Sequence, residues 1–393
     1  MPWKVSDVVD ERTRFVLDHE RGLWTMADLC RQYGIARKTG YIWVERYGEE
    51  GLAGLSDRPR APYRHPNQTP ETVEQQILAL RHEHPSWGPK KLRALLAREK
   101  PKIDWPALST MGELLQREGL TVAARKRRKT PPYTQPFQGA TTANAVWCAD
   151  FKGWFRSGQG ERIDPLTMTD AHSRYLLRCQ AVERTNTEQV RAIFEAAFRE
   201  YGLPAAMRTD NGAPFASRAI AGLSRLSVYL MKLDIVPERI APGHPEQNGR
   251  HERMHRTLKA ETANPPAGTR RAQQRRFDEF RWEYNEQRPH EALQQQTPAS
   301  CFQVSSRPFP ARVRSPEYPA SMQVRQVHRR GQIHWKGEEV FLTEALIAEP
   351  VGLERIEEHE WCIYFARFPI ARFDSRTLRV HAWSAIAAPT EPG

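Results

Sequence analysis

The sequence predicts a multidomain protein in which helical modules come first, an α/β core with a mixed sheet follows, and a small all-β barrel ends the chain. Three observations support this order. Helix caps and turns mark residues 5–122, strands and helices alternate over residues 145–285, and short runs of alternating apolar and polar residues fill residues 321–380. A chain of 393 residues is long enough for several such domains.

The amino-acid composition indicates what kind of molecule the protein binds and in which cellular compartment it works. The net charge is +12 and the pI is near 9.6, so we expect a polyanionic partner. The sequence has no apolar run of about 18 residues, which a membrane span needs, and its first residues, MPWKVSDVVDERTR, have no signal-peptide character. Five scattered cysteines without C-x-x-C spacing argue against a zinc ribbon and a disulfide framework. We therefore expect a cytoplasmic protein with no membrane partner.

The first module, residues 1–56, reads as three short helices. Thr25 is a predicted N-cap of the second helix, and Gly34 provides the turn before the third. Arg37 and Lys38 come at the start of that third helix. This is the helix-turn-helix arrangement, in which the third helix here would enter the major groove of DNA. An ordinary three-helix cluster is the alternative.

A second helix-turn-helix domain is predicted for residues 71–122, between two basic linkers. The linkers cover residues 57–70 and 123–140 and are rich in proline and arginine. A run of cations in the second linker is expected to contact DNA phosphates. The run consists of Arg125, Lys126, Arg127, Arg128 and Lys129.

The catalytic core is predicted for residues 141–300, followed by a Pro-rich connector at 301–320 and a basic barrel at 321–380. The amphipathic pattern of residues 187–201 predicts one helix of the core, and residues 217–233 are predicted to be mostly helical. The other predicted elements of the core are strands at 146–155, 162–169, 175–182, 205–208 and 238–241, and helices after Gly249 and at 270–285.

Three carboxylates form a candidate metal site. Asp150 lies in the apolar run VWCADFKGWF, where a carboxylate is costly unless a partner such as a metal neutralises it. Asp210 ends a predicted strand, and Glu252 lies on the helix after Gly249. Carboxylates shared between two ions favour Mg²⁺ or Mn²⁺ over zinc. Such a metal pair activates an attacking oxygen and stabilises a leaving one.

The stretch PGHPEQNGRHERMHRTLK, residues 242–259, allows three interpretations. The first is a solvated charged helix, because Glu252, Arg256 and Lys259 share one face with His255. His251 to His255 also matches the H-E-x-x-H motif of zinc proteases, although no third ligand is evident. In the third interpretation Glu252 completes a carboxylate triad for phosphoryl transfer.

The chain resembles bacterial insertion-sequence transposases with a retroviral-integrase-like catalytic core. The resemblance covers nearly the whole chain. It rests on the runs WCADFKG, TDAHSRYLL, RTDNGAPF, PEQNGRHERMHRTLK and YNEQRPHEAL. It implies a ribonuclease-H-like fold for the core, and a catalytic and metal-binding triad of Asp150, Asp210 and Glu252.

The resemblance also implies positions that contact DNA. Lys259, seven residues after the glutamate, matches the DNA-contacting lysine of the family, and Arg256 belongs to the same basic stripe. Asn211 and Gly212 match the residues that follow the second aspartate. Asn248 and Gly249 match the loop before the glutamate. The zinc module of retroviral enzymes is absent from the sequence, and helix-turn-helix units take its place.

Two glutamates are candidates for the third carboxylate of the triad, and spacing and context favour different ones. Glu246, with 35 residues between it and Asp210, fits the gap usual in the family, whereas 41 residues separate Asp210 from Glu252. Context favours Glu252, because it follows the glycine and precedes the lysine by seven residues. Two further acids, Asp164 and Asp170, are interpreted as structural, with Asp170 in a turn between strands.

The resemblance implies a DNA transposase of the integrase type. Such a protein binds terminal inverted repeats, cleaves at the ends of its element with Mg²⁺ or Mn²⁺, and joins them to double-stranded target DNA. A homo-oligomer on paired ends in the bacterial cytoplasm is expected. The alternative is a DNA-binding regulator with an inactive core. The sequence does not specify the DNA site, the target preference, the cut-and-paste or copying route, or any helper ATPase.

Overall fold

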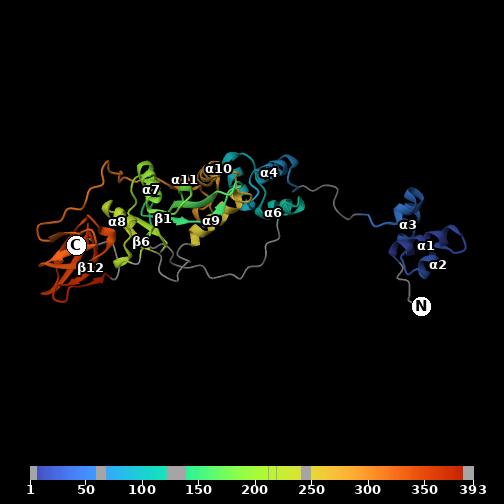
Figure 1. Cartoon of the computed structure of the whole chain (residues 1–393). Coiled ribbons are helices and arrows are strands. Elements are labelled where there is room, and N and C mark those ends of the chain that lie inside the picture. Colours follow the sequence, from blue (N-terminus) through green and yellow to red (C-terminus); the bar gives the residue numbers. More distant parts are fainter. Residues whose placement is uncertain are drawn as a thin grey trace. The chain divides into compact units, whose positions relative to one another are not determined.

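The chain divides into two units, Met1–Thr69 and Pro70–Gly393, and each is described by itself. A computed structural model describes residues 7–58, 68–121, 139–210, 212–217, 219–239 and 249–383 (Figure 1). Within these residues no helix has both the length and the apolar character that crossing a membrane requires. The boundaries assigned to the individual domains stay a prediction.

The first unit is a three-helix cluster, drawn in blue in Figure 1. The side chain of Thr25 accepts a hydrogen bond from the backbone N–H of Asp28 and so caps the second helix, as predicted. Gly34 turns the chain with a φ of +64°, and the third helix begins at Arg37. The predicted helix-turn-helix arrangement is therefore confirmed. Its elements are α1 (Val8–Glu20), α2 (Met26–Gln32), α3 (Arg37–Glu50) and the 3-10 turn η1 (Gly51–Leu55).

A second helical cluster opens the second unit. Its helices are α4 (Glu71–Glu83), α5 (Pro89–Glu99) and α6 (Leu108–Arg117). Their apolar faces meet around Trp87 and Met111, both fully buried. The guanidinium of Arg81 donates to the backbone carbonyls of Trp87 and Leu120. This side chain ties the turn between α4 and α5 to the end of the cluster.

A six-stranded mixed sheet forms the core that follows. β1 pairs antiparallel with β3 and parallel with β5, and β5 pairs parallel with β6. The strand order is β2-β3-β1-β5-β6, with β4 also paired to β3. The predicted mixed sheet is confirmed. Its strands are β1 (Val146–Phe151), β2 (Phe155–Arg156), β3 (Arg162–Asp170), β4 (Leu176–Val182), β5 (Ala206–Thr209) and β6 (Val236–Arg239).

Helices cover both faces of this sheet. On one face Phe198 stacks on Trp147 with 5.9 Å between ring centroids. On the other face Leu258 and Phe277 pack against Ile163, and all three are fully buried. The first face is covered by α7 (Thr187–Tyr201) and α8 (Arg225–Lys232), and the second by α9 (Gly249–Thr262) and α10 (Arg270–Trp282). Short turns η4 (Glu283–Gln287) and η5 (Glu291–Leu293) and helix α11 (Pro298–Cys301) follow α10.

The segment 217–233 is only partly helical. A 3-10 turn, η2 (Ile220–Gly222), comes first, and α8 begins only after Ser224. The hydroxyl of Ser224 accepts from the backbone N–H of Ser227, and the hydroxyl of Ser227 accepts from the N–H of Ser224. This reciprocal cap starts a new helix. The prediction of a mostly helical segment is therefore wrong over its first half.

The C-terminal part is all-β, as predicted, but its described strands do not close into a barrel. They form an open five-stranded sheet in the order β13-β12-β11-β10-β7 and a separate hairpin of β8 and β9. In the described part of the chain, β13 pairs only with β12 and β7 only with β10, so the two edges of the sheet stay apart. These strands, orange to red in Figure 1, are β7 (Gln323–Gln326), β8 (Gln332–Trp335), β9 (Glu338–Phe341), β10 (Pro350–Arg355), β11 (Glu360–Phe365), β12 (Phe368–Asp374) and β13 (Arg379–Ala382), with the turn η6 (Glu344–Leu346).

Candidate active site

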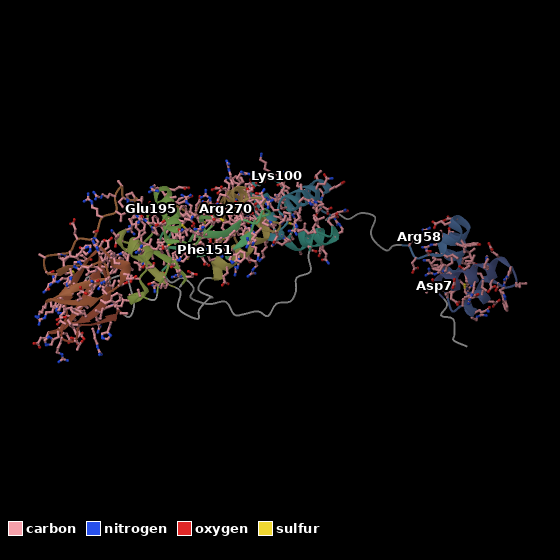
Figure 2. All side chains as sticks on the ribbon, viewed as in Figure 1. Asp7, Arg58, Lys100, Phe151, Glu195 and Arg270 are labelled. Atoms are coloured by element: carbon pink, nitrogen blue, oxygen red, sulfur yellow. The ribbon has the colours of Figure 1, made fainter. Side chains whose placement is uncertain are left out.

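The two predicted aspartates come at the same level of neighbouring parallel strands. β1 and β5 pair with Ala149 opposite Thr209, so Asp150 and Asp210 follow side by side along the two chains. Ala149 packs into the core beneath α7, and side chains alternate along a strand, so Asp150 faces the side that α9 covers. Figure 2 labels Phe151, the next residue, on the strands of the core. The predicted placement on adjacent strands is confirmed.

Burial and one backbone hydrogen bond act on the carboxyl group of Asp210. The side chain is half-buried, and burial raises its pKa above the ordinary value. The backbone N–H of Gly212 donates to its Oδ1 at 3.2 Å and opposes that rise. A divalent cation beside Asp210 would favour the ionised form.

Two histidines of α9 lie beneath the surface on the side of Asp150. His251 and His255 are 3% and 4% exposed. The Nε2 atoms of both rings lie 2.6 Å from the hydroxyl oxygen of Thr167, and Nδ1 of His251 lies 3.2 Å from the hydroxyl oxygen of Thr169. Both threonines belong to β3, and Thr167 lies opposite Asp150 in the sheet. These contacts hold α9 against the strand that neighbours β1.

Burial keeps both histidines neutral. It lowers the pKa of His251 to about 3, and it lowers the pKa of His255 further, with His251 and Lys152 adding to the effect. A neutral imidazole offers one nitrogen lone pair to a metal or a hydrogen-bond donor. The rings lie edge to face, with 4.6 Å between their centroids.

Asp150, His251 and His255 form a group that can hold a metal ion. One ligand atom from each lies within 4.8 Å of the other two. The sequence analysis found no third ligand for the His251–His255 pair, and the structure places Asp150 there. The signal for this group was the i, i+4 spacing of the histidines combined with an aspartate in a neighbouring strand. Carboxylate and imidazole donors suit a divalent cation, so the residues fit one.

The predicted charged face of α9 borders a surface hollow of about 550 Å³. Glu252, Arg256 and Lys259 are exposed there, as the helical spacing predicts. Lys152, two residues after Asp150, lines the opposite side from the loop that follows β1. His255 belongs to this hollow and also to the group around Asp150, so it joins the two.

The remaining candidate residues have varied positions. Arg37 and Lys38 are exposed at the first turn of α3, in the first unit. Gly249 opens α9. The other DNA-contact candidates and the alternative carboxylate lie outside the residues that the structure describes. They are Asn211, Asn248, Arg125, Lys126, Arg127, Arg128 and Glu246.

Asp164 and Asp170 have structural partners, as predicted. The side chain of Asp170 is fully buried and accepts hydrogen bonds from the backbone N–H groups of Asn144 and Ser173 and from the Ser173 hydroxyl. Asp164 forms an ion pair of 2.9 Å with Arg162. Both carboxylates have partners within the fold that fit a structural role.

Family models match most regions of the chain. A helix-turn-helix domain matches residues 11–63, and a homeodomain-like domain matches residues 39–115. Integrase core domain models match residues 140–245 and 233–298, and the model for the C-terminal domain of IS481 family transposases matches residues 322–381. The chain thus matches models of helix-turn-helix domains, of the integrase core and of the IS481 transposase C-terminal domain, in that order along the sequence.

Two relatives are proteins of bacterial insertion elements. A 31.7 kDa protein of insertion element IS407 from Burkholderia multivorans is 28% identical over 250 residues, which is 63% of this chain and 87% of the relative. A 39.2 kDa protein of IS476 from Xanthomonas euvesicatoria is 28% identical over 269 residues, covering 67% of this chain and 72% of the relative. The HTLV-2 integrase catalytic core domain is 15% identical, with a TM-score of 0.32 over 41% of this chain and 98% of that domain.

Proposed function

We propose that this protein is a DNA transposase that binds the terminal inverted repeats of its element, cleaves at its ends and joins them to double-stranded target DNA. The observation that carries the proposal is the parallel register of β1 and β5, after which Asp150 and Asp210 follow at one level, with Asp150 close to His251 and His255 of α9. That helix presents Glu252 and a basic stripe on its outer face. The integrase core, helix-turn-helix and IS481 matches support the same activity.

Asp150, Asp210 and Glu252 would hold two divalent cations, Mg²⁺ or Mn²⁺. The raised pKa of Asp210 and the partly buried position of Asp150 are both consistent with carboxylates that meet a cation. His255 lies between Asp150 and the hollow beside Glu252, where its neutral ring can orient Asp150 or share its ion. When bound, two such cations activate an attacking oxygen and stabilise the leaving one.

Glu252 is the better candidate for the third carboxylate. It lies on a helix that two buried histidines hold against β3, so its backbone is well positioned. It borders the same hollow as His255 and Lys152. Glu246 is kept as the alternative, because its spacing from Asp210 fits the family.

The cations of α9 would position the DNA backbone beside the carboxylates. Arg256 and Lys259 follow Glu252 by four and seven residues and line the same hollow. Their charges suit adjacent phosphate groups, which contribute affinity without reading sequence. Asn211, Asn248 and the run Arg125, Lys126, Arg127 and Arg128 are proposed as further DNA contacts.

Recognition of the repeat ends is proposed for the helix-turn-helix units. Arg37 and Lys38 begin α3, the helix that would enter the major groove. A homo-oligomer on paired ends would let one protomer act on DNA that another protomer holds.

Strand transfer in this proposal exchanges one phosphodiester for another. The 3′-hydroxyl oxygen at the element's end attacks a phosphorus atom of target DNA and loses its proton to solvent. The P–O3′ bond of the target breaks, and its oxygen leaves as a new 3′-hydroxyl after taking up a proton. One ester forms for each that breaks, so no external energy source is needed for this step.

A strand-transfer assay with Mg²⁺ and a duplex that carries the flanking repeat tests this proposal. We expect joined products with the natural protein, their loss with Asp150→Asn, Asp210→Asn and Glu252→Gln, and their retention with Glu246→Gln. Loss with Glu246→Gln but not with Glu252→Gln would move the third carboxylate into the preceding loop. Repeat binding without any joining by the natural protein would contradict the enzyme proposal and favour a DNA-binding regulator.

A further inference from the structure

A second cavity lies apart from the carboxylates, at the seam between the second helical cluster and the core. Its volume is about 350 Å³, within the range of small-molecule sites of about 300–1,000 Å³. Its lining includes Lys91 of α5, Thr169 of β3, Arg253 of α9, Tyr284 and residues 288–292. Its lining also includes His251, which belongs to the group around Asp150 as well, but it does not include Asp150, Asp210 or Glu252.

The seam that carries this cavity is held by polar contacts. Nδ1 of His84 lies 3.1 Å from a carboxylate oxygen of Glu283, and the Ser86 hydroxyl donates to Glu261 at 2.5 Å. The guanidinium of Arg288 also pairs with Glu261, at 3.0 Å, and lies over the ring of Trp87. The second helical cluster and the core thus form both walls of the cavity.

Four cationic side chains border the cavity, namely Lys91, Arg174, Arg253 and Arg288. Of these, only Arg288 has an ion pair with a carboxylate among the described residues. The two acidic residues in the lining are already engaged, because Asp170 accepts three hydrogen bonds and Glu291 pairs with Lys90 at 2.6 Å. Four cationic and two acidic side chains line the cavity, so its lining carries an excess of positive charge.

The charge excess affects the groups that line the cavity. Burial, together with the charge of Arg288, lowers the pKa of Lys91 to about 8. Burial and the charge of Arg253 lower the pKa of Arg174. Buried cations that lie close to other cations are stabilised when an anion binds beside them.

A hydrogen-bonding atom without a partner lies in the same lining. Nε2 of His290 is buried and has no hydrogen-bond partner among the described residues. The ring lies edge to face on Tyr284 with 4.7 Å between centroids, which fixes its orientation. Burial and the nearby cations keep it neutral by lowering its pKa to about 3. The other ring nitrogen hydrogen-bonds to the backbone of Tyr284, so in the neutral ring Nε2 is an acceptor that suits a protonated ligand oxygen.

We propose that this cavity is a binding site for a phosphate group. Lys91, Arg174 and Arg253, which form no ion pair with a carboxylate among the described residues, would supply the positive charges and the N–H donors. The phosphate could belong to DNA, in which case the proposal rests on the proposed function, or to a free phosphate compound. Both sources present the same oxygens, so experiment must separate them.

Titration of the full chain with inorganic phosphate in EDTA, followed by calorimetry, tests the site without any contribution from a divalent metal. We expect saturable binding at one site, weakened roughly tenfold or more by Lys91→Gln and by Arg174→Gln. Arg93→Gln is the matched control, because Arg93 is exposed on the same helix and does not line the cavity. Melting curves of each variant show that it is folded.

Competition then identifies the source. A duplex of unrelated sequence that displaces phosphate from the natural protein, and that binds Lys91→Gln more weakly than Arg93→Gln, would assign the site to the DNA backbone. Phosphate binding that the duplex leaves unchanged would assign it to a free compound. The proposal fails if phosphate does not saturate, or if Arg93→Gln weakens binding as much as Lys91→Gln does. Repeating the titration with Asp210→Asn separates this site from strand transfer, because the variant should keep phosphate binding and lose joining.

Discussion

The hydroxyl of Thr167 determines the protonation of two histidines. It donates to the backbone carbonyl of Asp150 at 3.2 Å, so its one hydrogen is used. When no metal ion binds to His251 and His255, their Nε2 atoms, each 2.6 Å away, can both donate to this oxygen. Nδ1 of His251 is left to accept from Thr169. Protonation of His251 would remove that acceptor, so the network requires a neutral ring.

This network predicts acid sensitivity. The unfolded chain binds protons at His251 and His255 below a pH of about 6.5, whereas the folded chain does not until the pH nears about 3 for His251. Stability should therefore fall as pH falls through this window, by up to about 1.4 kcal/mol per pH unit for each histidine. Denaturant unfolding between pH 7 and pH 4 measures the slope.

A substitution isolates the contribution of one ring. His251→Gln should reduce the slope, whatever it does to stability at pH 7, and His82→Gln should not, because His82 is exposed on α4. His290 also has a lowered pKa, so part of the slope should persist. Equal slopes for the natural protein and His251→Gln would contradict this account.

For single residues, the sequence predicted the positions of the two aspartates but not the contacts of the two histidines. Asp150 and Asp210 could be predicted because an aspartate within or directly after a buried strand is a local pattern. The partners of His251 and His255 could not, since Thr167 and Thr169 lie more than 80 residues earlier in the chain. Whether H-E-x-x-H faces solvent, a metal or a hydroxyl depends on that tertiary contact.

At the scale of elements, α9 shows how one helix can serve two surfaces. His251, Met254, His255 and Leu258 follow the i, i+3, i+4, i+7 pattern and are buried against the sheet. The charged residues occupy the opposite side, around the hollow. The common face of Glu252, Arg256 and Lys259 could be predicted because it depends only on helical periodicity. Their distance from Asp150 depends on packing and could not.

Helix α3 contains two glycines with opposite surroundings. A Cβ atom at Gly40 would lie 2.6 Å from the sulfur of Cys30 and 2.9 Å from the ring of Phe15, whereas a Cβ atom at Gly48 would contact nothing within 4 Å. Gly40→Ala should destabilise the first unit by roughly 1–3 kcal/mol through overpacking. Gly48→Ala should stabilise it by about 0.5–1 kcal/mol, because alanine is the better helix former.

Hydrogen exchange of the full chain measures both substitutions, since it reports on the backbone amides of α1 to α3 separately from the rest. Faster exchange in Gly40→Ala and slower exchange in Gly48→Ala is the expected result. Similar exchange in the two variants would show that α1 and α2 do not pack on α3 as closely as the structure has them.

The elements that sequence reasoning missed depend on distant pairing. The alternation of apolar and polar residues predicted the C-terminal strands. Closure into a barrel depends on whether β7 and β13 pair, and the residues of these two strands do not indicate this. The reciprocal cap of Ser224 and Ser227 is local. It was missed because serine is common in helices and loops alike.

For the whole molecule, the excess of positive charge agrees with the proposed partner. The net charge is +12, and cations occur on α3, along α9 and in the cavity at the seam. Order and type of domains could be predicted because each has its own periodicity. The seam cavity could not, since residues from five separate stretches of the chain line it.

Salt dependence measures the contribution of the first unit to DNA binding. Neutralising Arg37 and Lys38 together should reduce the slope of log affinity against log salt by about two, since each phosphate contact contributes about one. Arg21→Gln is a suitable control for a single charge, because Arg21 lies in the same unit and pairs with Asp18 at 3.0 Å. An unchanged slope for the double variant would show that α3 does not contact phosphates.

The pairing of β1 with β5 has a consequence for redesign. Neighbouring strands lie about 4.8 Å apart in any sheet, so the separation of the Asp150 and Asp210 backbones is a property of peptide hydrogen bonds. Exchanging the helices around the two aspartates would alter the access of DNA to them, the charge around them and the partner that binds. The separation of their backbones would stay constant. The sheet therefore fixes the distance between the backbones of Asp150 and Asp210. A designer could replace the surrounding helices without changing that distance.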